Sequence, residues 1–454
     1  MGFELDEQTK NDLGIFDVSI GKSLYDLFDL CISYGGKKRL RKIMSEPSTD
    51  RHFLMNRSDT IAYFQSHSRS ISHLDIDKNS LDFIEHYLNY HDQPTRKPNK
   101  FSAMEKGFMY RIKPNNDYYI IERGIDYTIE LLNNIRDFFT GLDGTELPEY
   151  LHSTRVQMEA VFKEKEFTAV SGIKNLRKLK AVEIANFDYM FRYTHRYQID
   201  YFVDLIYYLD VLTAMAKAAD KYHLCYPELR PSSEQIIQAE GLFHPLLKNA
   251  VGNDLRMDAG TNMIFITGPN MSGKSTFLKS LGIAAYLSHI GFPVPAVTFK
   301  ISILSGIYST INLKDNIQLN YSHFYSEIKR IKDIAERLEN KTDRLVIFDE
   351  LFRGTNVKDA FEGSLAIISA FAHTKRSFFV ISTHILEVAE RLKEENIRFV
   401  YLETINKNGI PFYTYKIKEG VSNERLGMYI IQKEKVIDSI NEANKRINES
   451  KKEI

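Results

Sequence analysis

A stretch near the middle of the chain combines glycines, a lysine and hydroxyl side chains in a spacing that suits a polyphosphate. It follows the apolar run 263–266 and precedes a segment of helical character. Glycines in such a loop let the backbone curve so that successive N–H groups point at the phosphates. The stretch consists of Gly268, Pro269, Asn270, Met271, Ser272, Gly273, Lys274, Ser275 and Thr276. We expect Lys274 to reach the β- and γ-phosphates and Ser275 to complete a Mg²⁺ shell, which predicts a user of nucleoside triphosphates.

Two adjacent carboxylates end a second apolar run. Residues 345–348 are apolar and are followed by Asp349 and Glu350, a pattern typical of a buried strand with charged residues at its end. Asp349 suits a water-mediated hold on Mg²⁺, and Glu350 suits a base that orients or deprotonates an attacking water. These two residues are therefore candidates for the metal ligand and the catalytic base.

A histidine follows a third apolar run, residues 378–381, after Ser382 and Thr383. His384 can lie against a γ-phosphate, although a histidine after a strand is more often a structural residue. Each of the three patterns alone is fallible. They follow one another along the chain, however, and the carboxyl ends of parallel strands meet at one edge of an open α/β sheet, where ligands bind. Their order favours a single nucleotide site.

These segments resemble the ATPase domain of the MutS family of DNA mismatch-repair proteins. The resemblance is carried by residues 268–276, 349–356 and 382–384, and it covers roughly residues 236 to 440. Residues 315–327 resemble the segment that a MutS partner subunit inserts into the opposite nucleotide site. The resemblance implies an α/β P-loop NTPase domain of the ABC/MutS type, with a mostly parallel sheet flanked by helices, and it implies ATP and Mg²⁺ as cofactors.

The same resemblance implies roles for individual residues. Asn270 would position the γ-phosphate, and Ser275 and Asp349 would hold the metal. Glu350 would be the catalytic base and His384 a γ-phosphate sensor. Ser322 would act in trans, in the site of a second, identical subunit.

The chain departs from the better-known family members at two places. Phe352 stands where those members have glycine, which indicates a repacked loop. Asn320 and Tyr321 replace a Gly-Arg pair beside the trans serine, which puts the strength of activation between subunits in doubt. The resemblance also implies that Tyr415 lies near the adenine.

The first half of the chain reads as helical. Apolar residues recur at spacings of three and four in residues 119–139 and 197–222, which places them on one stripe of each helix. We expect an all-α core and lever domain over residues 1–233, with a reduced or absent clamp, and the ATPase domain with a helical tail over residues 234–454. The N-terminal mismatch-recognition and connector domains of the full-length family members are expected to be absent.

The charge balance excludes a globally basic nucleic-acid binder. Lys and Arg number 60 and Asp and Glu number 60, so any DNA contact must come from local patches. The candidates are residues 37–42, for which a solvated helix face is the favoured interpretation, and the stretch from Lys174 to Arg196, for which the two interpretations are balanced. The sequence contains no signal peptide and no membrane-spanning run, so we expect a cytoplasmic protein.

The function predicted from these observations is that of a homodimeric MutS-like DNA-dependent ATPase that senses mismatched or damaged double-stranded DNA and signals to downstream repair proteins. Binding of branched or recombination-type DNA is the first alternative. A nucleotide-regulated scaffold that does not bind DNA is the second, which zero net charge permits. The Arg-Gly-Thr segment at 353–355 argues against a transporter-type or small-molecule phosphotransferase.

Overall fold

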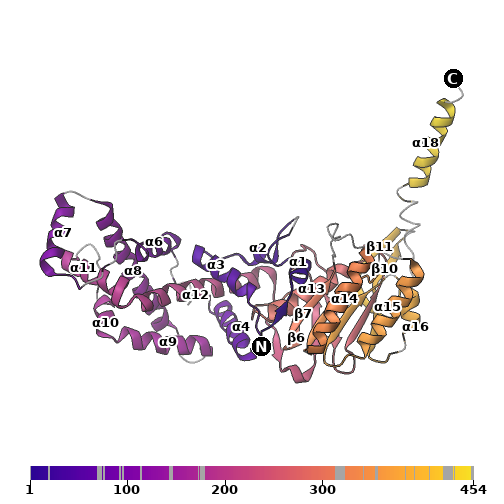
Figure 1. Ribbon diagram of the computed structural model, residues 1–454, viewed down its shortest axis with the longest axis horizontal. Coiled ribbons are helices and arrows are strands. Elements are labelled where there is room, and N and C mark those ends of the chain that lie inside the picture. Colours follow the sequence, from indigo (N-terminus) through magenta and orange to yellow (C-terminus); the bar gives the residue numbers. More distant parts are fainter. Residues whose placement is uncertain are drawn as a thin grey trace. The chain divides into compact units, whose positions relative to one another are not determined.

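The chain forms two compact units (Figure 1) in a computed structural model. The sheet unit comprises Met1–Gly14, Glu228–Tyr286 and Val294–Ile454, and the helical unit comprises Ile15–Pro227 and Leu287–Pro293. The structure describes every residue except 1, 19–20, 69–73, 75–76, 92–93, 95–96, 113–114, 143–146, 172, 174–178, 312–322, 341, 353–355, 384, 393, 408–409, 423–432, 434 and 451–454.

A mixed sheet of seven strands forms the centre of the sheet unit. In spatial order its strands are β1 (Glu4–Leu5), β7 (Gly306–Thr310), β8 (Arg344–Asp349), β9 (Phe378–Ser382), β5 (Met263–Thr267), β10 (Ile397–Lys407) and β11 (Ile410–Glu419). Neighbouring strands are parallel except for the antiparallel pair β10 and β11. The central strands β5, β8 and β9 are buried throughout, as strands covered by helices on both faces must be.

Helices cover both faces of this sheet. Val346 and Phe348 of β8 point into a core shared with α14 (His323–Asn340), α15 (Val357–Ala372) and α16 (Leu386–Arg391). Ile347, between them, faces Gly282 of α13 (Lys274–Ser288) on the opposite side. This alternation follows from the two-residue period of a strand. A smaller sheet contains, in order, β2 (Glu228–Arg230), β6 (Thr298–Ser302), β3 (Ile237–Leu242) and β4 (Asn253–Met257).

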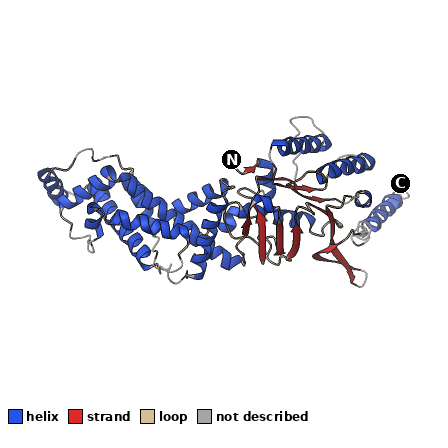
Figure 2. Cartoon of the chain, turned by 90° about the horizontal axis from the view of Figure 1, so that it is seen from below, coloured by secondary structure: helices blue, strands red, loops and turns tan. Residues whose placement is uncertain are grey.

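The helical unit confirms the prediction of a mostly helical first half, and every described strand lies in the sheet unit (Figure 2). The two periodic segments become α8 (Asn116–Gly141) and α12 (Arg196–Tyr222). The other elements are α2 (Leu24–Phe28), α3 (Tyr34–Ser45), α4 (Arg51–Ser66), α6 (Lys78–Leu88), α7 (Lys100–Ile112), α9 (Glu149–Phe162), α10 (Lys165–Ser171), α11 (Ala181–Tyr189) and the π-helix η2 (Met190–Thr194). No described helix is both long enough and apolar enough to cross a bilayer.

A buried carboxylate on α12 fixes the start of α3. Asp210 is 1% exposed and accepts hydrogen bonds from the backbone N–H groups of Ile32 and Ser33, at 3.0 and 2.8 Å. The Ser33 hydroxyl also donates to this carboxylate, and its oxygen accepts from the Gly36 N–H as an N-cap. One buried charge thereby positions a helix that lies far away in the sequence.

The first fourteen residues belong to the sheet unit, although the sequence analysis placed them with the helical half. Strand β1 pairs in parallel with β7, and α1 (Glu7–Leu13) follows it. Thr9 Oγ1 accepts a hydrogen bond from the Ser309 N–H at 2.9 Å. Asp12, 2% exposed, accepts from the Ser309 hydroxyl at 2.7 Å and from the Ile311 N–H at 2.9 Å. The N-terminal segment therefore satisfies polar groups at the carboxyl end of β7.

Arg330 of α14 makes a second connection to this segment. Its guanidinium bonds the Asp6 carboxylate at 2.5 Å and the Ser309 carbonyl at 2.9 Å. Burial raises the pKa of Asp6, but the hydrogen bond and the positive charge of Arg330 outweigh it and hold that pKa below its usual value. The pair is ionised at neutral pH, and its contribution to stability is lost as the pH falls through the lowered pKa.

Replacing Asp12 with alanine should destabilise the sheet unit. The substitution leaves the Ser309 hydroxyl and the Ile311 N–H buried without their acceptor, a cost of about 3 kcal/mol. We expect a lower urea midpoint and faster amide exchange at Ile311. The same change at the exposed Asp17 serves as the control. Equal midpoints for the two variants would contradict the bracing role of the N-terminal segment.

Candidate functional site

The loop of residues 268–273 connects β5 to α13 in a conformation that glycine allows. Gly268 and Gly273 have φ values of 142° and 103°, and Met271 adopts a φ of 69° between them. A side chain on Gly273 would meet the ring of Tyr415 at 3.1 Å. The second glycine is thus required both by its backbone angle and by the close approach of an aromatic ring.

Lys274 is the first residue of α13 and is 4% exposed. Its ammonium donates hydrogen bonds to the carbonyl oxygens of Gly268 at 2.8 Å and Pro269 at 3.2 Å, and lies 3.7 Å from a carboxylate oxygen of Glu350. The buried charge is therefore satisfied by its own loop and by one candidate catalytic residue. A polyphosphate would offer the same ammonium stronger, charged acceptors.

Two hydroxyl groups hold the Asp349 carboxylate. Ser275 Oγ donates to one carboxylate oxygen and Ser382 Oγ donates to the other. The sheet register explains why these three side chains lie together. Asp349 is paired with Ser382, and Ser382 is paired with Ile266, which lies just before the loop that precedes Ser275. Asp349 is 7% exposed, so these bonds offset part of the cost of burying its charge.

Glu350 follows with an unusual backbone. Its φ of 56° lies in the left-handed region, and its N–H donates to the carbonyl and hydroxyl oxygens of Ser382 at 3.1 and 3.2 Å. Its side chain lines the same cavity as the loop. These hydrogen bonds hold the candidate base, in its strained conformation, at the end of β9.

The oxygen donors at this edge of the sheet fit a magnesium ion. Ser275 and Asp349 supply a hydroxyl and a carboxylate in direct contact, and Mg²⁺ is usually bound by one or two such groups together with phosphates and water. Ser272 Oγ, which also lines the cavity, is buried and has no hydrogen-bond partner in the described part of the chain. It leaves a free donor beside the region where phosphates are expected.

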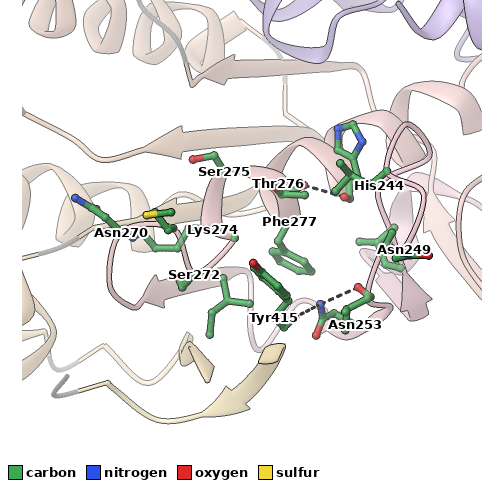
Figure 3. Close-up of a pocket in the computed structure, with 18 of the residues that line it drawn as sticks. His244, Asn249, Asn253, Asn270, Ser272, Lys274, Ser275, Thr276, Phe277 and Tyr415 are labelled. Atoms are coloured by element: carbon green, nitrogen blue, oxygen red, sulfur yellow. Dashed lines mark hydrogen bonds between the residues drawn. The ribbon is translucent and has the colours of Figure 1, made fainter. Parts of the chain in front are cut away.

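A cavity of about 730 Å³ extends from the loop (Figure 3). Asn270 and Lys274 lie toward one end, His244 and Asn249 toward the other, and Tyr415 lies between. Asn253, Phe277 and residues 247–251 also line the cavity. His244, Asn249, Asn253 and Phe277 were not predicted as site residues from the sequence, because no local pattern marks them.

A bulge in β11 turns Tyr415 toward this cavity. The pairing of β10 with β11 shifts register between Leu402 and Thr404, and Tyr415 adopts a φ of 57°. Asn253 fixes the bulge: its side-chain amide donates to the Tyr415 carbonyl at 2.9 Å and its oxygen accepts from the Ile417 N–H at 2.8 Å. This places an aromatic ring against Gly273 of the loop.

His244 is neutral at physiological pH. Burial and the nearby charge of Lys279 lower its pKa to about 4. It can therefore exchange a hydrogen bond with a ligand in the cavity, but it adds no positive charge there above about pH 4.

Two predicted site residues, His384 and Ser322, lie outside the described residues. Their expected roles as γ-phosphate sensor and trans-acting serine stay predictions. The described part of the chain contains no cluster of three His, Cys, Asp or Glu side chains that could hold a metal by themselves.

The basic stretches differ in exposure. In the second stretch Arg192 is 4% exposed and makes a bidentate ion pair with Asp188, and Phe191 is fully buried, whereas Lys180 and Tyr193 are exposed. In the first stretch Lys38 and Lys42 are exposed on α3. Of the two stretches, the first keeps more of its positive charge accessible within the described residues.

The fold and the site together define an α/β domain in which a loop with two positive-φ glycines joins a buried strand to a helix at the carboxyl edge of the sheet. A family model described as MutS domain V matches residues 264–451. The chain belongs to the MutS family, and the matched range, which is the ATPase domain of that family, lies in the sheet unit except for Leu287–Pro293.

Curated relatives carry the same family name. The DNA mismatch repair protein MutS of Anaplasma phagocytophilum is 33% identical over 227 residues, which is 49% of this chain and 27% of that protein. The human MutS protein homolog 4 is 30% identical over 335 residues, 67% of this chain and 35% of that protein. The MutS protein of Listeria welshimeri is 28% identical over 256 residues, 54% and 29% of the two chains. The matches therefore span between about a quarter and about a third of each relative's length.

Replacing Lys274 with alanine should weaken ATP binding by roughly 10- to 150-fold, because hydrogen bonds to a charged group contribute about 1.5–3 kcal/mol. Titration with a fluorescent ATP analogue measures the effect. Lys358→Ala, which removes an exposed lysine on α15 of the same unit, is the matched control. Unchanged affinity in the Lys274 variant would refute the assignment of the loop.

Proposed function

We propose that this protein is a DNA-dependent ATPase of mismatch-repair type that binds MgATP in the cavity beside residues 268–276. The observation that carries the proposal is the Asp349 carboxylate, held between the Ser275 and Ser382 hydroxyls next to the buried ammonium of Lys274. The Ser275 and Asp349 oxygens would bind the metal there, and the Lys274 ammonium would bind phosphate. This is the pairing that triphosphate chemistry requires.

Phosphate binding would use the Lys274 ammonium, which now bonds loop carbonyls, and the Ser272 hydroxyl. Lys274 Nζ would exchange the carbonyls of Gly268 and Pro269 for phosphate oxygens, and the buried Ser272 hydroxyl would gain an acceptor. Asn270 would position the γ-phosphate. Mg²⁺, held by Ser275 and through water by Asp349, would neutralise charge on the β- and γ-phosphates.

The nucleobase would occupy the opposite end of the cavity. Tyr415 presents 45% of its surface, and the Asn253 amide fixes its backbone, so its ring is available for stacking at little conformational cost. The neutral His244 and the side chain of Asn249 offer polar contacts there. This end of the site suits an uncharged aromatic base.

Hydrolysis would depend on Glu350 as the base for the attacking water. The Glu350 carboxylate lines the cavity 3.7 Å from the Lys274 ammonium, and it would accept a proton from that water. His384 would sense the γ-phosphate. Ser322 of a second copy would complete the site, which makes the active form a homodimer.

DNA would be the partner that the ATPase cycle controls. The Anaplasma and Listeria relatives are named DNA mismatch repair proteins. Exposed lysines on α3 suit contacts to phosphate, which carry affinity but no sequence information. Mismatched duplex is the proposed ligand, and signalling to downstream repair proteins would follow from the nucleotide state.

Glu350→Gln should bind ATP with unchanged affinity and hydrolyse it about 100-fold more slowly, because general-base catalysis contributes at least that factor. Steady-state phosphate release and equilibrium binding are measured on the same preparation. Glu362→Gln, at an exposed glutamate on α15, is the control. Wild-type turnover in the Glu350 variant would remove its role as base.

DNA dependence is tested with homoduplex, mismatched duplex and four-way-junction DNA at two salt concentrations. We expect mismatched duplex to bind most tightly and to change the ATPase rate most, with affinity falling as salt rises because phosphate contacts release counterions. Preference for the junction would favour the branched-DNA alternative. Absence of salt-dependent binding to all three would favour a scaffold that does not contact DNA.

A further inference from the structure

Phe352 adopts a backbone conformation that its side chain disfavours. Its φ is 64°, in the left-handed region, and it lies two residues after Glu350, whose φ is 56°. A bulky residue with positive φ is an outlier that the surrounding structure must hold in place. A glycine would satisfy this angle at no steric cost. The phenylalanine therefore requires a reason in its packing.

The ring of Phe352 fills a space between two helices. It is 3% exposed and belongs to the core beneath α14, α15 and α16. Its centroid lies 5.2 Å from that of Phe324 on α14, with the planes at 65°. On the α15 side the ring lies against Gly363, where a methyl group would come within 3.0 Å of Cε2 and 3.3 Å of Cδ2.

Gly363 has no backbone need to be glycine. It lies in the middle of α15, outside the left-handed region, where alanine is the better helix former. Its missing side chain instead provides the space that the Phe352 ring occupies. The Phe352 ring thus packs against the bare backbone of Gly363, and we call this pair of residues the Phe352 seat.

The seat constrains the candidate base from one side. On the other side, the Glu350 N–H is bonded to the hydroxyl and carbonyl of Ser382. Only Leu351, itself 4% exposed, separates the two anchors. A backbone fixed at both ends of this three-residue span cannot leave the left-handed conformation at Glu350 without breaking one anchor.

We propose that Phe352 is a positioning residue that, through its packing on Gly363, holds Glu350 in the left-handed conformation needed for ATP hydrolysis. The proposal rests on the ATPase function proposed above. It extends that function by assigning catalytic positioning to a residue that touches neither nucleotide nor metal. The binding of ATP, which uses the loop and Asp349, does not depend on it.

The test is a double-substitution cycle of Gly363→Ala, Phe352→Ala and both together. In Gly363→Ala the added methyl displaces the ring, so turnover should fall roughly tenfold to a hundredfold while the ATP dissociation constant stays unchanged. In the Phe352→Ala background the ring is gone, so the same methyl should cause no further loss. Glu362→Ala, next to Gly363 but exposed, controls for changes in the helix itself.

Hydrogen exchange supplies a readout that needs no ATPase activity. The peptide covering residues 344–352 should exchange faster in Gly363→Ala, through loss of the Glu350 anchor, and Gly363→Ala should not accelerate exchange in the Phe352→Ala background. Melting temperatures show whether each variant is folded, and Phe352→Leu, which keeps an apolar side chain, should recover part of the turnover.

Two results would overturn the proposal. The first is wild-type turnover and exchange in Gly363→Ala. The second is an equal loss from Gly363→Ala with and without the ring at position 352. If the wild-type protein binds ATP but does not hydrolyse it on any DNA, the proposed function fails, and the exchange data alone then decide whether the seat positions Glu350.

Discussion

The Asp349 carboxylate, held by two serine hydroxyls, is the interaction on which the site depends. A carboxylate 7% exposed is costly to bury unless its oxygens are satisfied. Ser275 contributes from the first turn of α13 and Ser382 from the end of β9. Three segments that are far apart in the sequence are thereby fixed at one point. The buried Lys274 ammonium beside them is satisfied in the same way, by loop carbonyls.

Strained backbone gathers around the same cavity. Met271, Glu350 and Tyr415 line it with positive φ, and Phe352 lies just behind Glu350 with the same feature. Such residues persist only where neighbours hold them, which here are the Ser382 hydrogen bonds, the Asn253 amide and the Gly363 surface. Hydrogen bonds thus hold the Glu350 and Tyr415 backbones beside the cavity, and packing holds the Phe352 ring in the core.

Much of the site at the carboxyl edge of the seven-stranded sheet could be predicted from local sequence patterns. The loop and the Asp349–Glu350 pair each follow an apolar run that becomes a buried strand, and parallel strands end at one edge. The pairing of β1 with β7 could not be predicted, because a two-residue strand has no detectable periodicity. Tyr415 was expected near the adenine only through the family resemblance, since a register shift that turns its ring leaves no local signal. The glycine that receives Phe352 is visible only once α15 is packed.

Helix α13 connects the loop at the site to a segment of the helical unit. Its first residue, Lys274, is the proposed phosphate contact, and its last residues begin the segment Leu287–Pro293, which belongs to the helical unit. Within that unit, Arg57 donates to the Ile290 carbonyl at 2.6 Å and the Ser48 N–H donates to the His289 carbonyl at 2.7 Å. Because α13 runs unbroken for fifteen residues, one helix carries both the proposed phosphate contact and the start of this hydrogen-bonded segment. The proposed ATPase therefore has a covalent route from its phosphate site to the helical unit, independent of any contact surface.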